Sequence, residues 1–131
     1  MTLSAAQFGF TKLLVNDLER TADFYKAVCG LEELARVESV IGGRAMSEIM
    51  FKPTAAGAAT FVLLRFHDAQ APAEDEVITG FITPDLDGFV ARVEAAGGSI
   101  HEPIRARPEH GVKVAFVKDP EGHLIEVVEL I

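Results

Sequence analysis

The sequence predicts an α+β fold built from two βαβββ units. Two landmarks recur at one spacing: Asp17-Leu18 corresponds to Asp85-Leu86, and Gly30 corresponds to Gly98, each 68 residues further on (17 to 85; 30 to 98). A single offset for two landmarks indicates a structural duplication. Each copy combines one helical pattern with four strand-like runs. The 131 residues, of which 49% are hydrophobic, suit one domain that spans residues 1–131.

The first unit covers about residues 8–66 and begins with a strand-like run at 8–15. Asn16 or Asp17 can cap the helix that follows, because their side chains accept hydrogen bonds from the free N–H groups of its first turn. Gly30 stands where the left-handed residue after the helix is needed. The other strands of this unit are expected near 31–40, 44–51 and 59–66.

The second unit, about residues 77–130, repeats this order after a polar, proline-containing linker at about 67–76. Asp85 can cap its helix, and the Gly97-Gly98 pair can end it. Its strands are expected near 77–83, 99–106, 111–118 and 123–130.

The composition excludes several classes of partner. The net charge is −8 and there is no basic cluster, so we expect neither nucleic acid nor an anionic membrane surface as a partner. No segment has the length of a membrane span, and residues 1–10 lack the basic and apolar regions of a signal peptide. The lone cysteine, Cys29, cannot form an internal disulfide, which favours a cytoplasmic location.

The most distinctive motif lies near the end of the chain, where residues 119–127 read "DPEGHLIEV". A proline–glycine turn leads into a strand that holds one acid, Glu126, among apolar residues. With the paired βαβββ units and the Asp-Leu-capped helices, this motif resembles the vicinal oxygen chelate superfamily, which includes glyoxalase I, extradiol dioxygenases and bleomycin resistance proteins. The resemblance covers essentially the whole chain. It implies a curved, cup-like mixed sheet with the helices on its convex side, a small organic ligand or metal in the cup, and a homodimer.

The resemblance also implies where metal ligands would stand, in the first and last strands of each unit. In this sequence those positions are Phe10, Leu63 or Leu64, Ile78 and Glu126. Only Glu126 has an atom that a divalent cation can bind. We therefore expect no cofactor; a divalent metal would require an unusual set of ligands, Glu126 with His101 or His110.

Strand alternation predicts the lining of the cup. If Glu126 faces inward, so does Leu124, and the other strands add mostly apolar side chains. The register of the last strand of the first unit stays open, with either Leu63 or Leu64 facing the cup. Phenylalanine and methionine in the lining favour an aromatic or apolar ligand. The predicted ligand contacts are Phe8, Phe10, Lys12, Met46, Glu48, Met50, Leu63, Arg65, Ile78, Gly80, Ile82 and Leu124.

Three alternative functions follow. The first is a metal-independent lyase, isomerase or cyclase with Glu126 as the general base on a C–H bond next to a carbonyl. In it, His110 is a second candidate catalytic residue, and Lys12 or His110 is the best candidate for stabilising the oxyanion. The second is a protein that sequesters a drug or metabolite, as bleomycin resistance proteins do. The third is a metal-dependent enzyme that resembles glyoxalase I or a dioxygenase.

Overall fold

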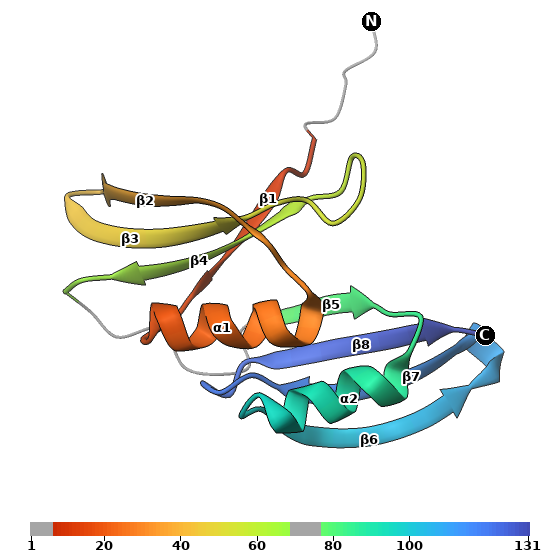
Figure 1. The fold of residues 1–131 in the computed structure, drawn as a ribbon. Helices are drawn as coiled ribbons and strands as arrows, with labels where there is room; N and C mark the ends of the chain where they lie inside the picture. The colour runs from red at the N-terminus through yellow and green to blue at the C-terminus, as the bar shows by residue number, and fades with distance from the viewer. Residues whose placement is uncertain (1–6, 69–76) are drawn as a thin grey trace, which may run out of the picture.

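The computed structural model describes residues 7–68 and 77–131, and it has the predicted order of elements (Figure 1). Unit one contains β1 (Phe10–Leu14), α1 (Leu18–Cys29), β2 (Glu33–Ile41), β3 (Arg44–Phe51) and β4 (Thr60–Phe66). Unit two contains β5 (Ile78–Ile82), α2 (Leu86–Ala95), β6 (Ser99–Arg107), the short 3-10 helix η1 (Pro108–His110), β7 (Val112–Lys118) and β8 (Leu124–Leu130). The α+β class is therefore confirmed. Most of the expected linker, residues 69–76, lies outside the described residues.

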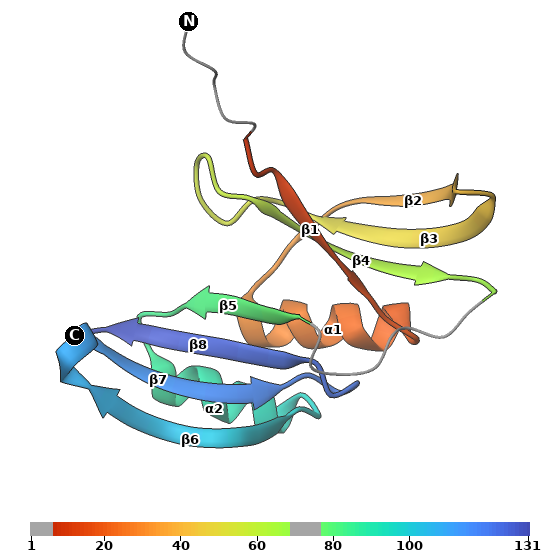
Figure 2. The same ribbon diagram turned by 180° about the vertical axis from the view of Figure 1, so that it is seen from behind.

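Each unit forms its own mixed four-stranded sheet (Figure 2). The strand orders are β1-β4-β3-β2 and β5-β8-β7-β6, and in both units the first strand is parallel to the last. Within the described residues, no strand of one sheet pairs with the other sheet, so β1 and β5 are both edge strands. The expected cup therefore consists of two sheets with separate hydrogen-bond ladders.

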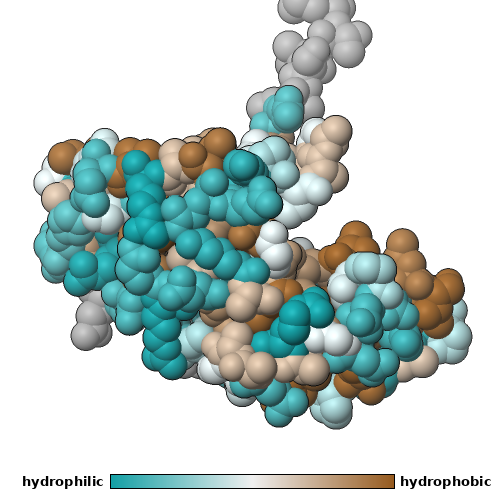
Figure 3. Space-filling model, viewed as in Figure 1, coloured by the Kyte–Doolittle hydropathy of each residue, from teal (hydrophilic) through white to brown (hydrophobic). Residues whose placement is uncertain are grey.

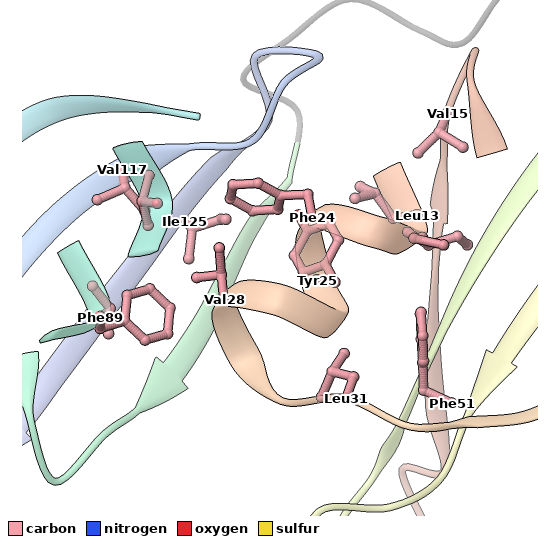
Figure 4. Packing of buried hydrophobic residues seen from close by; sticks show 14 of the residues in the cluster. Leu13, Val15, Phe24, Tyr25, Val28, Leu31, Phe51, Phe89, Val117 and Ile125 are labelled. Atoms are coloured by element: carbon pink, nitrogen blue, oxygen red, sulfur yellow. The ribbon is translucent and has the colours of Figure 1, made fainter. Parts of the chain in front are cut away.

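The core lies between the sheets, where α1 is placed in both views of the ribbon (Figures 1 and 2). Figure 4 shows side chains of α1 between core residues of the two units. Those drawn from α1 are Phe24, Tyr25 and Val28; those around them include Leu13 and Phe51 of unit one and Phe89, Val117 and Ile125 of unit two. Each sheet thus has a helix-covered face, which holds the core, and an opposite face without a helix, which we call the helix-free face.

The helices begin where the sequence predicts. The Asp17 carboxylate accepts a hydrogen bond from Arg20 N, and the Asp85 carboxylate accepts one from Gly88 N, each at 3.1 Å. These bonds satisfy N–H groups that the first turn of a helix leaves free. No helix in the part of the chain that the structure describes is long and apolar enough to cross a bilayer.

The two helices end differently. Gly30 follows α1 with φ +68°, the left-handed conformation expected there. After α2 that conformation belongs to Gly97, with φ +90°. Gly98 is needed for space, because a Cβ atom there would lie 2.5 Å from the backbone oxygen of Lys118 and 2.7 Å from Phe24 Cε1. The two glycines of the repeat therefore serve different purposes.

A buried carboxylate in the β7–β8 turn joins unit two to α1. Asp119 is 3% exposed, and its Oδ2 atom accepts a hydrogen bond from the Tyr25 hydroxyl at 2.9 Å. Its Oδ1 atom accepts from the backbone N–H groups of Glu121 and His123. His123 Nδ1 lies 2.8 Å from Oδ2. Hydrogen bonding to Asp119 raises the pKa of His123, whereas burial raises the pKa of Tyr25 well above its ordinary value.

The same turn caps α1. The Glu121 carboxylate accepts hydrogen bonds from Asn16 N at 2.8 Å, from Asp17 N at 2.6 Å and from Thr21 Oγ1 at 3.1 Å. A carboxylate at a helix N-terminus satisfies free donors and interacts favourably with the helix dipole. Unit two therefore fixes the start of the helix of unit one.

Candidate functional site

Strand pairing resolves the register that the sequence leaves open. Lys12 pairs with Val62 across β1 and β4, and Gly80 pairs with Glu126 across β5 and β8. Lys12 and Gly80 are equivalent in the repeat (12 to 80, an offset of 68), so Val62 is the counterpart of Glu126 (62 to 126, an offset of 64). Three residues of this shortening come from the loop 52–59 of unit one, which is longer than the turn 119–123 of unit two.

Two of the expected ligand contacts lie on the other side of the sheet. Leu63 is fully buried in the core on the helix-covered face. Arg65, two residues further along β4, lies on the same face and lines a separate cavity of about 440 Å³ near the start of α1. Val62, Leu64 and Phe66 occupy the helix-free face instead, because they pair there with the alternate residues of β3.

Glu126 lies on the helix-free face of unit two. Its neighbours in the chain, Ile125 and Val127, are fully buried in the core on the opposite face, while Glu126 is partly exposed. It pairs with Gly80 on one side and with Phe116 on the other. A Cβ atom added at Gly80 would meet nothing within 4 Å, so there is open space beside the carboxylate. Among the described residues, none forms a hydrogen bond or ion pair with Glu126.

The neighbours of Glu126 along β8 and on β5 are apolar, whereas β7 and β6 add the charged residues Lys118 and Glu102 to the same face. Leu124 and Val128 flank it on the same face of β8, and both are partly buried. β5 adds Ile78 and Ile82, which are 56% and 73% exposed. Figure 3 shows hydrophobic residues gathered at the end of unit two where β5 and the C-terminus lie. One acid within an apolar surface is an arrangement that small-molecule sites use.

The helix-free face of unit one holds a pair of opposite charges. Lys12 Nζ donates a hydrogen bond to Glu48 Oε2 at 2.9 Å. Phe10 lies at the exposed edge of this face, with its ring centre 5.7 Å from Lys12 Nζ, and Phe8 is exposed just before it. Other predicted contacts on this face are Met46, which is buried, and Met50, which is partly buried. This face is more closed than that of unit two.

A cavity of about 650 Å³ separates the edge of unit one from β5. Its lining is mostly apolar and includes Leu31, Phe61, Ile78, Phe81 and Ile82. The two edge strands therefore leave apolar surface uncovered where the units meet.

The histidines are not gathered around Glu126. His110 lies in η1 and is exposed, and His101 is exposed on β6, the strand at the far edge of the sheet from β5. Within residues 7–68 and 77–131, no three His, Cys, Asp or Glu side chains form a group that could hold a metal ion. The sequence places the unit-one last-strand ligand position at Leu63 or Leu64; strand pairing corrects it to Val62, so the four positions are Phe10, Val62, Ile78 and Glu126. One donor among four residues does not fit a divalent cation.

The thiol of Cys29 is unsuited to nucleophilic chemistry. It is partly buried at the end of α1, and burial raises its pKa to about 12. The thiol therefore stays protonated at neutral pH and is a weak nucleophile.

These features, two βαβββ units with a helix-free face on each sheet, define a protein class. The chain belongs to the Glyoxalase/Bleomycin resistance protein/Dioxygenase superfamily, whose family model matches residues 7–127. It is 28% identical over 125 residues to a probable lactoylglutathione lyase of Vibrio cholerae. The aligned region covers 91% of this chain and 87% of that protein.

Solved structures share this fold. A glyoxalase family protein of Bacillus cereus has a TM-score of 0.82 at 18% identity, covering 98% of this chain and 97% of that one. The fosfomycin resistance protein FosX of Listeria monocytogenes has a TM-score of 0.70 at 20% identity, covering 99% and 96%. At these identities the structures show the fold alone. The resemblance inferred from the sequence is confirmed.

Proposed function

We propose that this chain is a metal-independent lyase, isomerase or cyclase, in which Glu126 is the general base and the ligand is an apolar or aromatic carbonyl compound. The observation that carries the proposal is the placement of Glu126 on the helix-free face, beside open space at Gly80 and with no partner among the described residues. A partly exposed carboxylate with no partner among the described residues is available to contact a ligand.

The reaction uses proton transfer alone. The Glu126 carboxylate takes a proton from a carbon next to the carbonyl group, and the electron pair of the C–H bond moves to the carbonyl oxygen to give an enolate. When a C=C bond extends the enolate, protonated Glu126 returns the proton to the far carbon of that system and the double bond shifts, which gives an isomer; return to the opposite face of the same carbon gives an epimer. If the enolate instead expels a group from the adjacent carbon, the product is that of a lyase. Both outcomes balance without an oxidant or reductant.

Glu126→Gln tests this role, because it keeps the shape of the side chain and removes the base. Exchange of the acidic C–H of an aromatic diketone, benzoylacetone, and of an aromatic 2-oxo acid, phenylpyruvate, can be followed by proton NMR in D₂O. We expect the wild type to accelerate exchange and the variant to lose about 10²- to 10⁴-fold of that acceleration. Ligand affinity should change little. Glu94→Gln, at an exposed acid of α2, is the control. Exchange at the wild-type rate in Glu126→Gln would contradict the proposal.

A second candidate is a binding protein that sequesters its ligand without chemistry. The observation that favours it is the apolar character of Phe10, Val62 and Ile78, three of the four positions marked by the family. In that case the wild type accelerates no exchange, and Glu126→Gln weakens ligand binding instead.

The name of the Vibrio cholerae relative supports a third candidate, a metal-dependent lactoylglutathione lyase. Stoichiometric nickel, zinc or iron in the purified protein would favour it over the other two. The homodimer and the cytoplasmic location remain predictions. The exposed side chains of Phe8, Phe10, Ile78 and Ile82 at the two edge strands support the homodimer, because a second copy could cover them.

A further inference from the structure

The ion pair of unit one is set deep in its helix-free face. The Lys12 side chain is 31% exposed and the Glu48 side chain 7% exposed. Lys12 pairs across the strands with Val62 and Glu48 pairs with Leu64, and both of these partners are almost fully buried. Among the described residues, Lys12 is the one side chain that bonds to the Glu48 carboxylate.

Stability does not explain such a pair. Removing the Glu48 carboxylate from water costs on the order of several kcal/mol, which its attraction to the partly exposed Lys12 recovers only with further hydrogen bonds. Glu48 has one such bond. Apolar residues of similar volume are often as stable or more stable at such a site. The pair is therefore better explained by what it binds.

Lys12 retains unused donors. An ammonium group has three N–H donors, and in the described structure the Lys12 ammonium donates to Glu48. The bond to Glu48 fixes the position of this partly exposed ammonium group. The ring of Phe10, 57% exposed, lies beside it. A fixed cation next to an exposed aromatic ring suits an anionic oxygen carried on an aromatic or apolar molecule.

The two units carry opposite charges at equivalent strand pairs. The Lys12–Val62 pair of unit one corresponds to the Gly80–Glu126 pair of unit two. The cation is on the first strand of one unit, and the acid is on the last strand of the other.

We propose that Lys12, positioned by Glu48, binds a carboxylate of the ligand, so that the ligand is an aromatic or apolar carbonyl compound that carries a carboxylate. This inference shares one assumption with the proposed function, namely that the ligand binds at the helix-free faces. It does not depend on Glu126 being a base. Lys12 contacts the ligand, whereas Glu48 acts through Lys12 and is a positioning residue.

Two test ligands that differ in charge examine this inference. Benzoylformate is an aromatic 2-oxo acid, and its methyl ester lacks the charge. Dissociation constants can be measured by ligand-observed NMR titration of the full chain. We expect the wild type to bind benzoylformate about tenfold more tightly than the ester, the effect of one charge-assisted hydrogen bond.

The decisive variant replaces both members of the pair. Lys12→Met alone leaves Glu48 buried without a partner and can fail to fold. Lys12→Met combined with Glu48→Leu removes both charges, so it should unfold at about the wild-type temperature and lose the preference for the acid. Lys113→Met is the matched control, because Lys113 is 32% exposed and pairs with Glu129 at 3.1 Å, but lies on the helix-covered face. It should keep the preference.

The outcomes separate this inference from the proposed function. Glu126→Gln should keep the preference for the acid even where it abolishes proton exchange. A double variant that folds and still prefers the acid tenfold would overturn the role of Lys12, as would a wild type that binds both ligands equally. If Lys113→Met lost the preference for the acid as fully as the double variant does, the role of Lys12 would also be overturned. The preference would then come from the net charge of the protein.

Discussion

The helix-free faces of the two units differ although their strands pair in the same way. In unit one, Met46, Val62 and Leu64 are at most 3% exposed, and the charges are neutralised as an ion pair. In unit two, Glu126 is partly exposed beside a glycine and has no partner among the described residues. Duplication has kept the backbone pairing while each unit has acquired its own side-chain chemistry.

The segments before the last strand of each unit differ as well. The loop 52–59 bonds within unit one, as in the bonds from Lys52 N to Glu32 O and from Ala58 N to Ala55 O. The shorter turn 119–123 sends two carboxylates into unit one, Asp119 to Tyr25 and Glu121 to the start of α1. The carboxylates that join the units through hydrogen bonds therefore come from unit two.

The largest expected effect follows from removing the buried carboxylate of that turn. Asp119→Ala leaves the Tyr25 hydroxyl and two backbone N–H groups without their acceptor. We expect a loss of about 3–5 kcal/mol in the free energy of unfolding, measured by urea denaturation. Asp23→Ala, at an exposed acid of α1, should change it by less than about 0.5 kcal/mol. A similar small change in Asp119→Ala would show that the turn does not hold the units together.

The two glycines of the repeat provide a sharper comparison. Gly98→Ala should cost about 1–3 kcal/mol through crowding against Lys118 and Phe24. Gly30→Ala should cost about 1–2 kcal/mol through its left-handed backbone, since a Cβ atom there meets open space.

Asparagine distinguishes the two causes, because it tolerates the left-handed conformation but needs more room than alanine. Gly30→Asn should therefore be more stable than Gly30→Ala, and Gly98→Asn should be less stable than Gly98→Ala. The same order at both positions, measured by thermal denaturation, would contradict the assignment of conformation to one glycine and space to the other.

The smallest effect concerns pH. Asp119 raises the pKa of His123 in the folded state, and the nearby Glu121 acts in the same direction. The stabilisation by protonated His123 is therefore complete below the ordinary histidine pKa and is lost as the pH rises through the raised value. His123→Gln should destabilise the protein more at about pH 5.5 than at about pH 8.5, measured as urea midpoints. His101→Gln, at an exposed histidine, should show no such difference.

The elements could be predicted from the sequence because their signals are local. Asp17, Asp85 and Gly30 act within a turn of their own helices, and the structure confirms them. Which side chains of β4 lie on each face of the sheet could not be predicted. The strand "TFVLLRF" is apolar on both faces, and the length of the preceding loop sets its register. Glu126 posed a related problem, since the apolar residues around it do not alternate with polar ones.

The hydrogen bonds between the two units could not be predicted from the sequence for another reason. "DPEG" predicts a turn, and the structure has one, but the partner of Asp119 is Tyr25, 94 residues earlier in the chain. A contact at that separation leaves no periodic pattern in the sequence. The Lys12–Glu48 pair, 36 residues apart, was likewise predicted as two separate lining residues.

The bonds from Glu121 to the start of α1 have a consequence for biosynthesis. Asn16 and Glu121 are 105 residues apart, so on the ribosome the first helix is made long before the group that caps it. Its opening turn cannot acquire that cap until the final hairpin has emerged. A nascent chain that stalls midway would therefore have the Asp17 cap of this helix but lack the bonds to Glu121.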